Sequence, residues 1–123
     1  MKYVNILDFS AFHTLFSTSD FAEYCNLFWN YGQLLKTELS QKIYASLSND
    51  SIVLFLTEKE ISLLLQELQQ LKHYPSLKTT VEKYYPYLVS FLSQKELEKL
   101  GYLPFSLQDQ VFITKCRILH QRT

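Results

Sequence analysis

The sequence feature that most constrains this fold is a helix-start pattern that occurs twice. The two copies are Thr57-Glu58-Lys59-Glu60 and Ser93-Gln94-Lys95-Glu96. In each copy the hydroxyl side chain can accept a hydrogen bond from the amide three residues later, and the glutamate at that position can reach back to the cap amide. An apolar residue before each cap and another inside the helix are placed to form a hydrophobic staple. Two helix starts are therefore predicted, at Thr57 and Ser93.

The low content of turn-forming residues also favours helices. Two glycines and three prolines in 123 residues are few for the many turns of a multi-stranded β protein. Apolar spacing predicts helices over 9–16, 20–47, 57–74, 76–92, 93–100 and 107–119. Gly32 weakens the middle of the long second helix by about 1 kcal/mol relative to Ala, so two helices meeting near Gly32 are the alternative there. Pro86 predicts a break or kink at Tyr84-Tyr85, and Gly101 a helix end.

Two segments are ambiguous between helix and strand. Ile52-Val53-Leu54-Phe55 fits a buried helical turn or a short strand, and the β-branched run within 111–119 fits either as well. We predict one mainly α domain over 1–123, a compact bundle of about five or six helices. The alternative is an α+β fold in which the N-terminus pairs with 111–119 in a small sheet.

Composition points toward a protein partner. Nine Phe, nine Tyr and one Trp exceed what one small core hides completely, so some tyrosines are expected at the surface. The net charge is zero, with −4 in residues 1–67 and +4 in 68–123, so no overall field attracts nucleic acid or a membrane. Neither is expected as a partner. Two cysteines far apart, with no secretion signal expected at the N-terminus, predict a cytoplasmic location.

No residue pattern indicates catalysis, a cofactor or a metal. Cys116 and His120 have the spacing of two metal ligands, but further ligands at a matching spacing are missing, and the apolar neighbours of Cys116 favour a buried, inert thiol. The glutamates near helix starts are explained by capping and the helix dipole. Both glycines stand alone, so there is no phosphate-binding loop. We therefore expect a protein that is not an enzyme.

One part of the chain resembles the colicin-type DNase immunity proteins, which are small helical proteins. The matching residues are Thr57-Glu58-Lys59-Glu60-Ile61, Leu64-Leu65, Leu68, Leu71, His73-Tyr74-Pro75-Ser76 and Tyr84-Tyr85-Pro86. In that family a capped acidic helix is followed by a proline-containing turn and a short helix ending in Tyr-Tyr-Pro. Its members bind a nuclease toxin, with paired tyrosines as shared anchors and helix residues selecting the partner.

The resemblance implies a bacterial immunity or antitoxin protein that neutralises a cognate toxin, in particular a nuclease, through a protein interface. The residues expected to contact the toxin are Tyr84, Tyr85, Tyr87, Glu58, Glu60 and Glu67. The alternative is a regulatory or assembly module without a toxin partner, such as a phage-type inhibitor, an adaptor or a homodimer. The sequence does not determine the oligomeric state.

Overall fold

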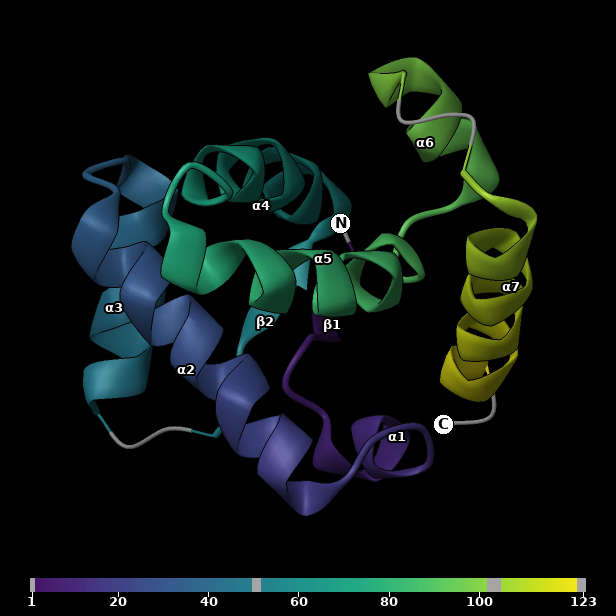
Figure 1. Cartoon of the computed structure of the whole chain (residues 1–123), viewed down its shortest axis with the longest axis horizontal. Coiled ribbons are helices and arrows are strands. Elements are labelled where there is room, and N and C mark those ends of the chain that lie inside the picture. Colours follow the sequence, from purple (N-terminus) through teal and green to yellow (C-terminus); the bar gives the residue numbers. More distant parts are fainter. Residues whose placement is uncertain (1, 50–51, 102–104, 122–123) are drawn as a thin grey trace.

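The structure is a computed structural model that describes residues 2–49, 52–101 and 105–121. Within these residues seven helices accompany one two-stranded sheet, which confirms the mainly α prediction. The elements are β1 (Tyr3–Asn5), α1 (Phe9–His13), α2 (Thr18–Leu34), α3 (Glu38–Ser48), β2 (Phe55–Thr57), α4 (Glu58–Leu71), α5 (Pro75–Val89), α6 (Gln94–Leu100) and α7 (Leu107–Gln121). In Figure 1, α2 and α3 lie on one side, α4 and α5 in the middle, and α6 and α7 on the other side.

The number of helices exceeds the prediction because the expected helix over 20–47 is two helices. α2 ends at Leu34 and α3 begins at Glu38, where the Thr37 hydroxyl accepts from the Ser40 amide and the Ser40 hydroxyl from the Thr37 amide. This reciprocal cap satisfies the amides that a new helix start leaves open. The alternative of two helices is therefore the correct one, with its break just beyond Gly32.

The two predicted helix starts are both present. At Thr57 both bonds of the capping box form with Glu60. At Ser93 the first bond of the capping box forms, because the hydroxyl accepts from the Glu96 amide at 3.2 Å. The Glu96 carboxylate pairs with Lys99 Nζ at 3.5 Å. α6 ends at Gly101, whose φ of 71° is the left-handed conformation that favours glycine after a helix.

The sheet differs from the one in the α+β alternative, and the helix predicted over 107–119 is confirmed. β1 pairs antiparallel with β2, with Val4 opposite Leu56, whereas 111–119 lies in helix α7. The N-terminal strand of the α+β alternative therefore exists, but its partner is 55–57. Val4 and Leu56 turn toward the core, and Leu56 is fully buried.

Pro86 does not break its helix. α5 continues through it to Val89, although the proline lacks the amide that would bond to the Glu82 carbonyl. Val81, Tyr84 and Leu88 hold the inner face of α5 against the core. The break expected at Tyr84-Tyr85 is therefore absent.

A cluster of aromatic rings forms the part of the core where α1, α2 and α5 meet. The Phe12 ring lies 4.8 Å from Tyr24, 5.9 Å from Tyr84 and 5.3 Å from Tyr87, measured between centroids. All four side chains are fully buried. Large aromatic rings of this kind contribute strongly to core stability. Tyr3 and Tyr74 are 55% and 42% exposed, which confirms the prediction that some tyrosines lie at the surface.

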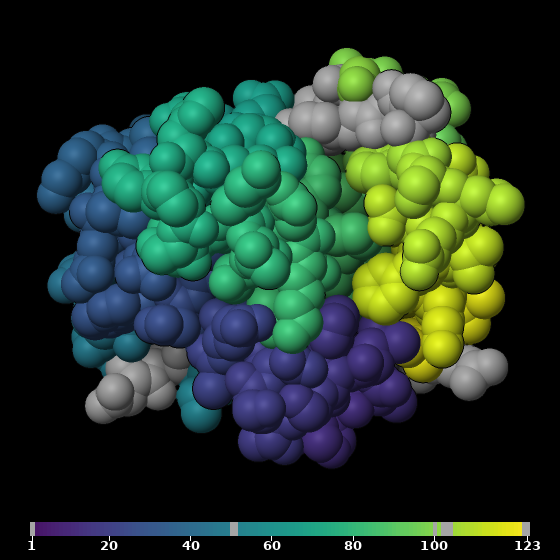
Figure 2. Space-filling view, viewed as in Figure 1, coloured from purple at the N-terminus to yellow at the C-terminus, as the bar shows by residue number. Residues whose placement is uncertain are grey.

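α7 forms one edge of the molecule in Figures 1 and 2 and packs mainly on α5. Its inner face contributes Ile113 and Cys116 to the core. None of the described helices is long and apolar enough to span a membrane.

Candidate functional site

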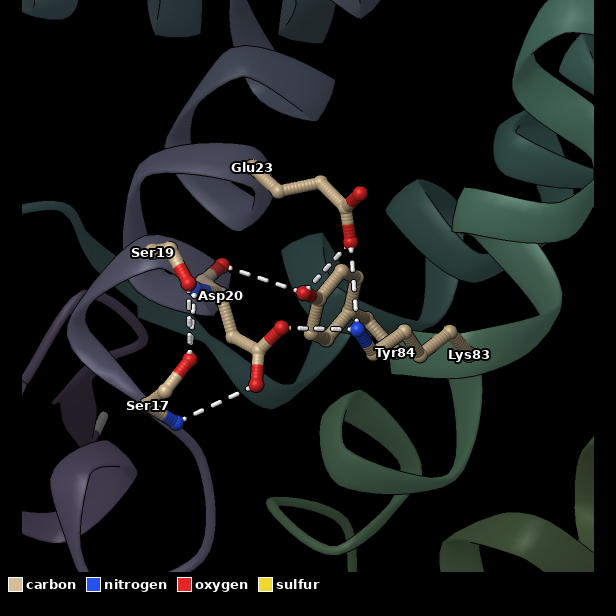
Figure 3. A network of polar contacts seen from close by, with 6 residues as sticks. All are labelled: Ser17, Ser19, Asp20, Glu23, Lys83 and Tyr84. Carbon is tan, nitrogen blue, oxygen red and sulfur yellow. Dashed lines mark hydrogen bonds and ion pairs between the residues drawn. The ribbon is translucent and has the colours of Figure 1, made fainter.

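Tyr84, the first predicted contact residue, joins α5 to the start of α2. Its side chain is fully buried, and its hydroxyl lies 3.0 Å from the Asp20 carbonyl oxygen and 2.7 Å from the Glu23 carboxylate. Lys83 Nζ lies 2.7 Å from the Asp20 carboxylate and 3.4 Å from that of Glu23 (Figure 3). Burial and the bond to Glu23 raise the pKa of Tyr84 above its usual value. The side chain thus crosslinks two helices.

Tyr85 and Tyr87 are also enclosed. Tyr87 is fully buried, with its ring 5.2 Å from that of Phe91, and Tyr85 is 8% exposed beneath Lys72, whose Nζ lies 5.6 Å from the ring centroid. The resemblance implies exposed anchors, whereas the fold uses all three tyrosines internally. A partner can reach Tyr84 or Tyr87 only where the core opens.

Two of the three predicted glutamates lie at the surface, at the start of α4. Glu58 is exposed. Glu60 completes the cap of α4 and pairs with Lys42 of α3 at 2.5 Å. Burial opposes the charge on Glu60, but the bonds from Lys42 and the Thr57 amide outweigh it and lower the pKa. Glu58 is thus the predicted acidic contact most open to a partner.

Glu67 lies on the opposite, inner side of α4 and is only 7% exposed. Its carboxylate accepts hydrogen bonds from the Tyr31 hydroxyl and, at 3.0 Å, from the Thr37 hydroxyl. Burial and the neighbouring carboxylate raise the pKa of Tyr31, so its phenol stays protonated. Glu67 therefore ties α4 to α2 and to the cap of α3, and its position is that of a structural residue.

A cleft of about 640 Å³ lies between β1, the turn after α5 and the end of α7. Its lining includes Asn5, Asp8, Ser90, Arg117 and His120. This volume is within the range of ligand pockets, and the Ser90 hydroxyl lies 2.8 Å from His120 Nε2. A serine beside a histidine in a cleft of this size is the arrangement of a possible nucleophile and base.

The Ser90 hydroxyl has the wrong proton arrangement for a nucleophile. It donates its one proton to the Tyr87 carbonyl, so the bond to His120 must use the proton on Nε2. Activation requires the opposite direction, with the serine donating to the histidine. Burial lowers the pKa of His120 to about 4, and its ring stacks on Phe91 at 4.2 Å. The pair is better suited to anchoring α7 on the end of α5.

Cys116 does not join His120 in a reactive or metal-binding pair. The thiol is fully buried, and burial raises its pKa to about 11, so the thiolate needed for attack or metal binding is strongly disfavoured. Among the described residues, no three His, Cys, Asp or Glu side chains are grouped to hold a metal ion.

The outer face of α7 carries the feature that the sequence reasoning missed. Leu107, Val111 and Ile118 are 77%, 63% and 48% exposed. The core contacts come from Ile113 and from Cys116, whose burial was predicted, on the opposite side of the helix. The available signal was that the apolar residues of 107–119 divide into two stripes rather than one.

The exposed stripe is continuous along three turns. Thr114, which is also exposed, lies between Val111 and Ile118, and its hydroxyl donates back to the Gln110 carbonyl at 2.9 Å. The hydroxyl is thus satisfied within the helix. We call Leu107, Val111, Thr114 and Ile118 the α7 outer stripe.

Comparison of the chain with protein-family models, with curated proteins and with solved structures finds no match.

Proposed function

We propose that this chain acts by binding another protein, and that it neutralises a cognate toxin domain, in the first place a nuclease, as immunity proteins and antitoxins do. The observation that carries the binding function is the α7 outer stripe. A helix packed on a core needs one apolar stripe, and α7 has a second one on its outer side.

Isolated apolar side chains at a surface are ordinary, but an aligned group on one helix face is typical of a contact surface. Covering Leu107, Val111 and Ile118 would contribute about 1 to 2 kcal/mol each, according to how completely each is buried. α7 forms an edge of the molecule (Figure 2), so a partner can reach its outer side. The stripe therefore replaces the tyrosines as the main proposed contact.

The toxin-neutralising part of the proposal rests on the resemblance of the segment from Thr57 to Pro86 to the immunity proteins. Glu58, exposed at the start of α4, keeps the selecting role that the resemblance implies. Tyr84, Tyr85 and Tyr87 act in this proposal by holding the fold that presents the contact surface.

The test is co-expression with toxin domains encoded beside the gene of this protein. A cognate domain should stop growth alone, should be tolerated with this chain, and should co-purify with it at one to one. Val111→Asp places a charge in the middle of the stripe and should abolish protection, while Gln66→Asp, on the exposed side of α4, should retain it. Failure to protect against every such domain would contradict the neutralising function.

A regulatory or assembly role is the second candidate, and the same stripe favours it because a second copy could cover it. Sedimentation of the purified chain over a hundredfold range of concentration distinguishes the two. A dimer that Val111→Asp dissociates would support assembly, and a monomer throughout would support capture of a different protein.

A further inference from the structure

We infer that the partner covers the α7 outer stripe with a helix whose flanking positions carry carboxylates. This inference rests on the proposed function only in taking the occupant to be a different protein. Beyond the proposed function, it specifies the secondary structure and the charge of the partner segment that binds the stripe.

The spacing of the stripe is that of a helix-pairing face. Leu107, Val111, Thr114 and Ile118 follow one another at steps of four, three and four residues, which is the alternation of the a and d positions in paired helices. Val111 and Ile118 fall at a, and Leu107 and Thr114 at d. β-branched residues at a with leucine at d are the combination that favours two-stranded pairing. A strand or an irregular loop would not match this period.

The backbone supports the same contact. α7 has 15 residues and is therefore about 22 Å long, enough for two heptads of a partner helix. The bond from Thr114 to the Gln110 carbonyl leaves no unsatisfied hydroxyl at the one non-aliphatic position. A partner helix can therefore cover the stripe without burying an unpaired polar group.

The flanks of the stripe determine the charge of the partner. The e and g positions beside it are Gln108, Lys115, Gln110 and Arg117, two amides and two cations without a carboxylate. Asp109, the one acid of the helix, is at f, on the side away from the stripe. The Arg117 guanidinium also bonds to the Leu92 carbonyl, so Lys115 is the more available cation.

This charge pattern favours a different protein over a second copy. Two copies would bring Lys115 and Arg117 of each chain into one interface with no carboxylate from the flanks to pair them. A partner helix with Glu or Asp at its own e and g positions would supply those pairs, which in helix pairing set the choice of partner. The requirement concerns the docking helix alone and holds whatever the total charge of the partner.

The experiment uses two synthetic peptides with the same Leu and Ile residues at a and d. One carries Glu at every e and g position and the other Lys, so that like charges keep each peptide from pairing with itself. Fluorescence anisotropy with the full chain should show the Glu peptide binding at least tenfold more tightly than the Lys peptide at low salt. The difference should shrink in 0.5 M NaCl, because exposed charges are screened.

Three variants locate the contact. Val111→Asp should weaken Glu-peptide binding at least tenfold, and Lys115→Glu should shift the preference toward the Lys peptide. Gln66→Asp, outside α7, should change neither. Circular dichroism of each variant verifies that the helices are retained.

Equal affinity for the two peptides, no binding of either, or binding unaffected by Val111→Asp would overturn the inference. A stripe-dependent dimer of the chain itself would also overturn it, by assigning the stripe to a second copy. The peptides involve no toxin, so their binding without protection in cells would contradict the proposed function alone. Protection that survives Val111→Asp would instead contradict the docking site and leave neutralisation standing.

Discussion

At the scale of residues, several polar side chains that resemble contact groups in the sequence are internal crosslinks. Tyr84 connects α5 to the start of α2 through Asp20 and Glu23, and Glu67 connects α4 to Tyr31. A buried hydroxyl that has hydrogen-bond partners contributes more to folding stability than one that has none. Only the first replaces the hydrogen bonds that it made to water in the unfolded chain. Tyr84 and Tyr87 offer this comparison within one helix.

Tyr84→Phe should lower the free energy of unfolding by about 1 to 2 kcal/mol, because it removes the hydrogen bonds of the Tyr84 hydroxyl to the Asp20 carbonyl and the Glu23 carboxylate. Tyr87→Phe is the matched control. The Tyr87 hydroxyl is buried and makes no hydrogen bond among the described residues, so its removal should be neutral or slightly stabilising. Urea denaturation followed by circular dichroism measures both, and equal losses would contradict this assignment.

At the scale of elements, the way α2 crosses α3 explains a glycine that helix propensity alone disfavours. A Cβ added to Gly32 would lie 2.6 Å from the Tyr44 Cβ and 3.2 Å from the Ser40 carbonyl oxygen. The first contact is with an atom fixed to the backbone, so a rotamer change does not relieve it. Gly32 is therefore required by the close approach of two helices.

Gly32→Ala should destabilise the protein by about 1 to 2 kcal/mol, because the steric cost of overpacking exceeds the gain of about 1 kcal/mol in helix propensity. Gln33→Ala, at the exposed neighbouring position, gains propensity without the contact and should be neutral or mildly stabilising. Thermal and urea unfolding of the two variants provide the comparison. A stabilised Gly32→Ala would show that α2 and α3 are less closely packed than described.

At the scale of the whole molecule, the C-terminal helix is held to the rest by core packing and by side-chain hydrogen bonds. Ile113 and Cys116 enter the core, Arg117 donates to the Leu92 carbonyl, and His120 bonds to Ser90. The α7 outer stripe can face a partner only while these contacts keep the inner face of α7 on α5. The position of the proposed binding surface therefore depends on the contacts that hold α7 to α5, including the bond between His120 and Ser90.

Stability should fall as the pH is lowered from about 6.5 toward 4. Burial lowers the pKa of His120 to about 4, against about 6.5 in an unfolded chain, although Asp8 nearby acts in the opposite direction. Between these values the unfolded chain binds a proton that the folded chain does not, so the stabilisation is complete above pH 6.5. Because the ring is partly exposed, we expect a loss of about 1 to 2 kcal/mol.

His120→Gln keeps a donor for Ser90 but does not titrate, so its stability should change less between pH 7.5 and 5. Urea midpoints of the two proteins at both pH values give the difference. The same pH slope in the variant would assign the effect to other groups, such as carboxylates.

Most helix starts and ends follow from residues that are close together in the chain. The caps at Thr57 and Ser93 and the glycine after α6 act through bonds that span three or four residues, so neighbours in the chain decide them. Residues 111–119 became a helix for a related reason, since a helix satisfies its own backbone and needs no strand partner.

The tertiary structure decided what depends on residues distant in sequence. β1 needs a partner about fifty residues away, and the local pattern of 52–56 does not identify it. The packing of α7 on α5 determines which stripe of α7 faces inward. The packing of α5 on α2 determines that Tyr84 is a core residue and not an exposed anchor. Apolar side chains lose contact with water equally well in a core or under a partner, so periodicity places them on a face and only the packing determines which neighbour covers it.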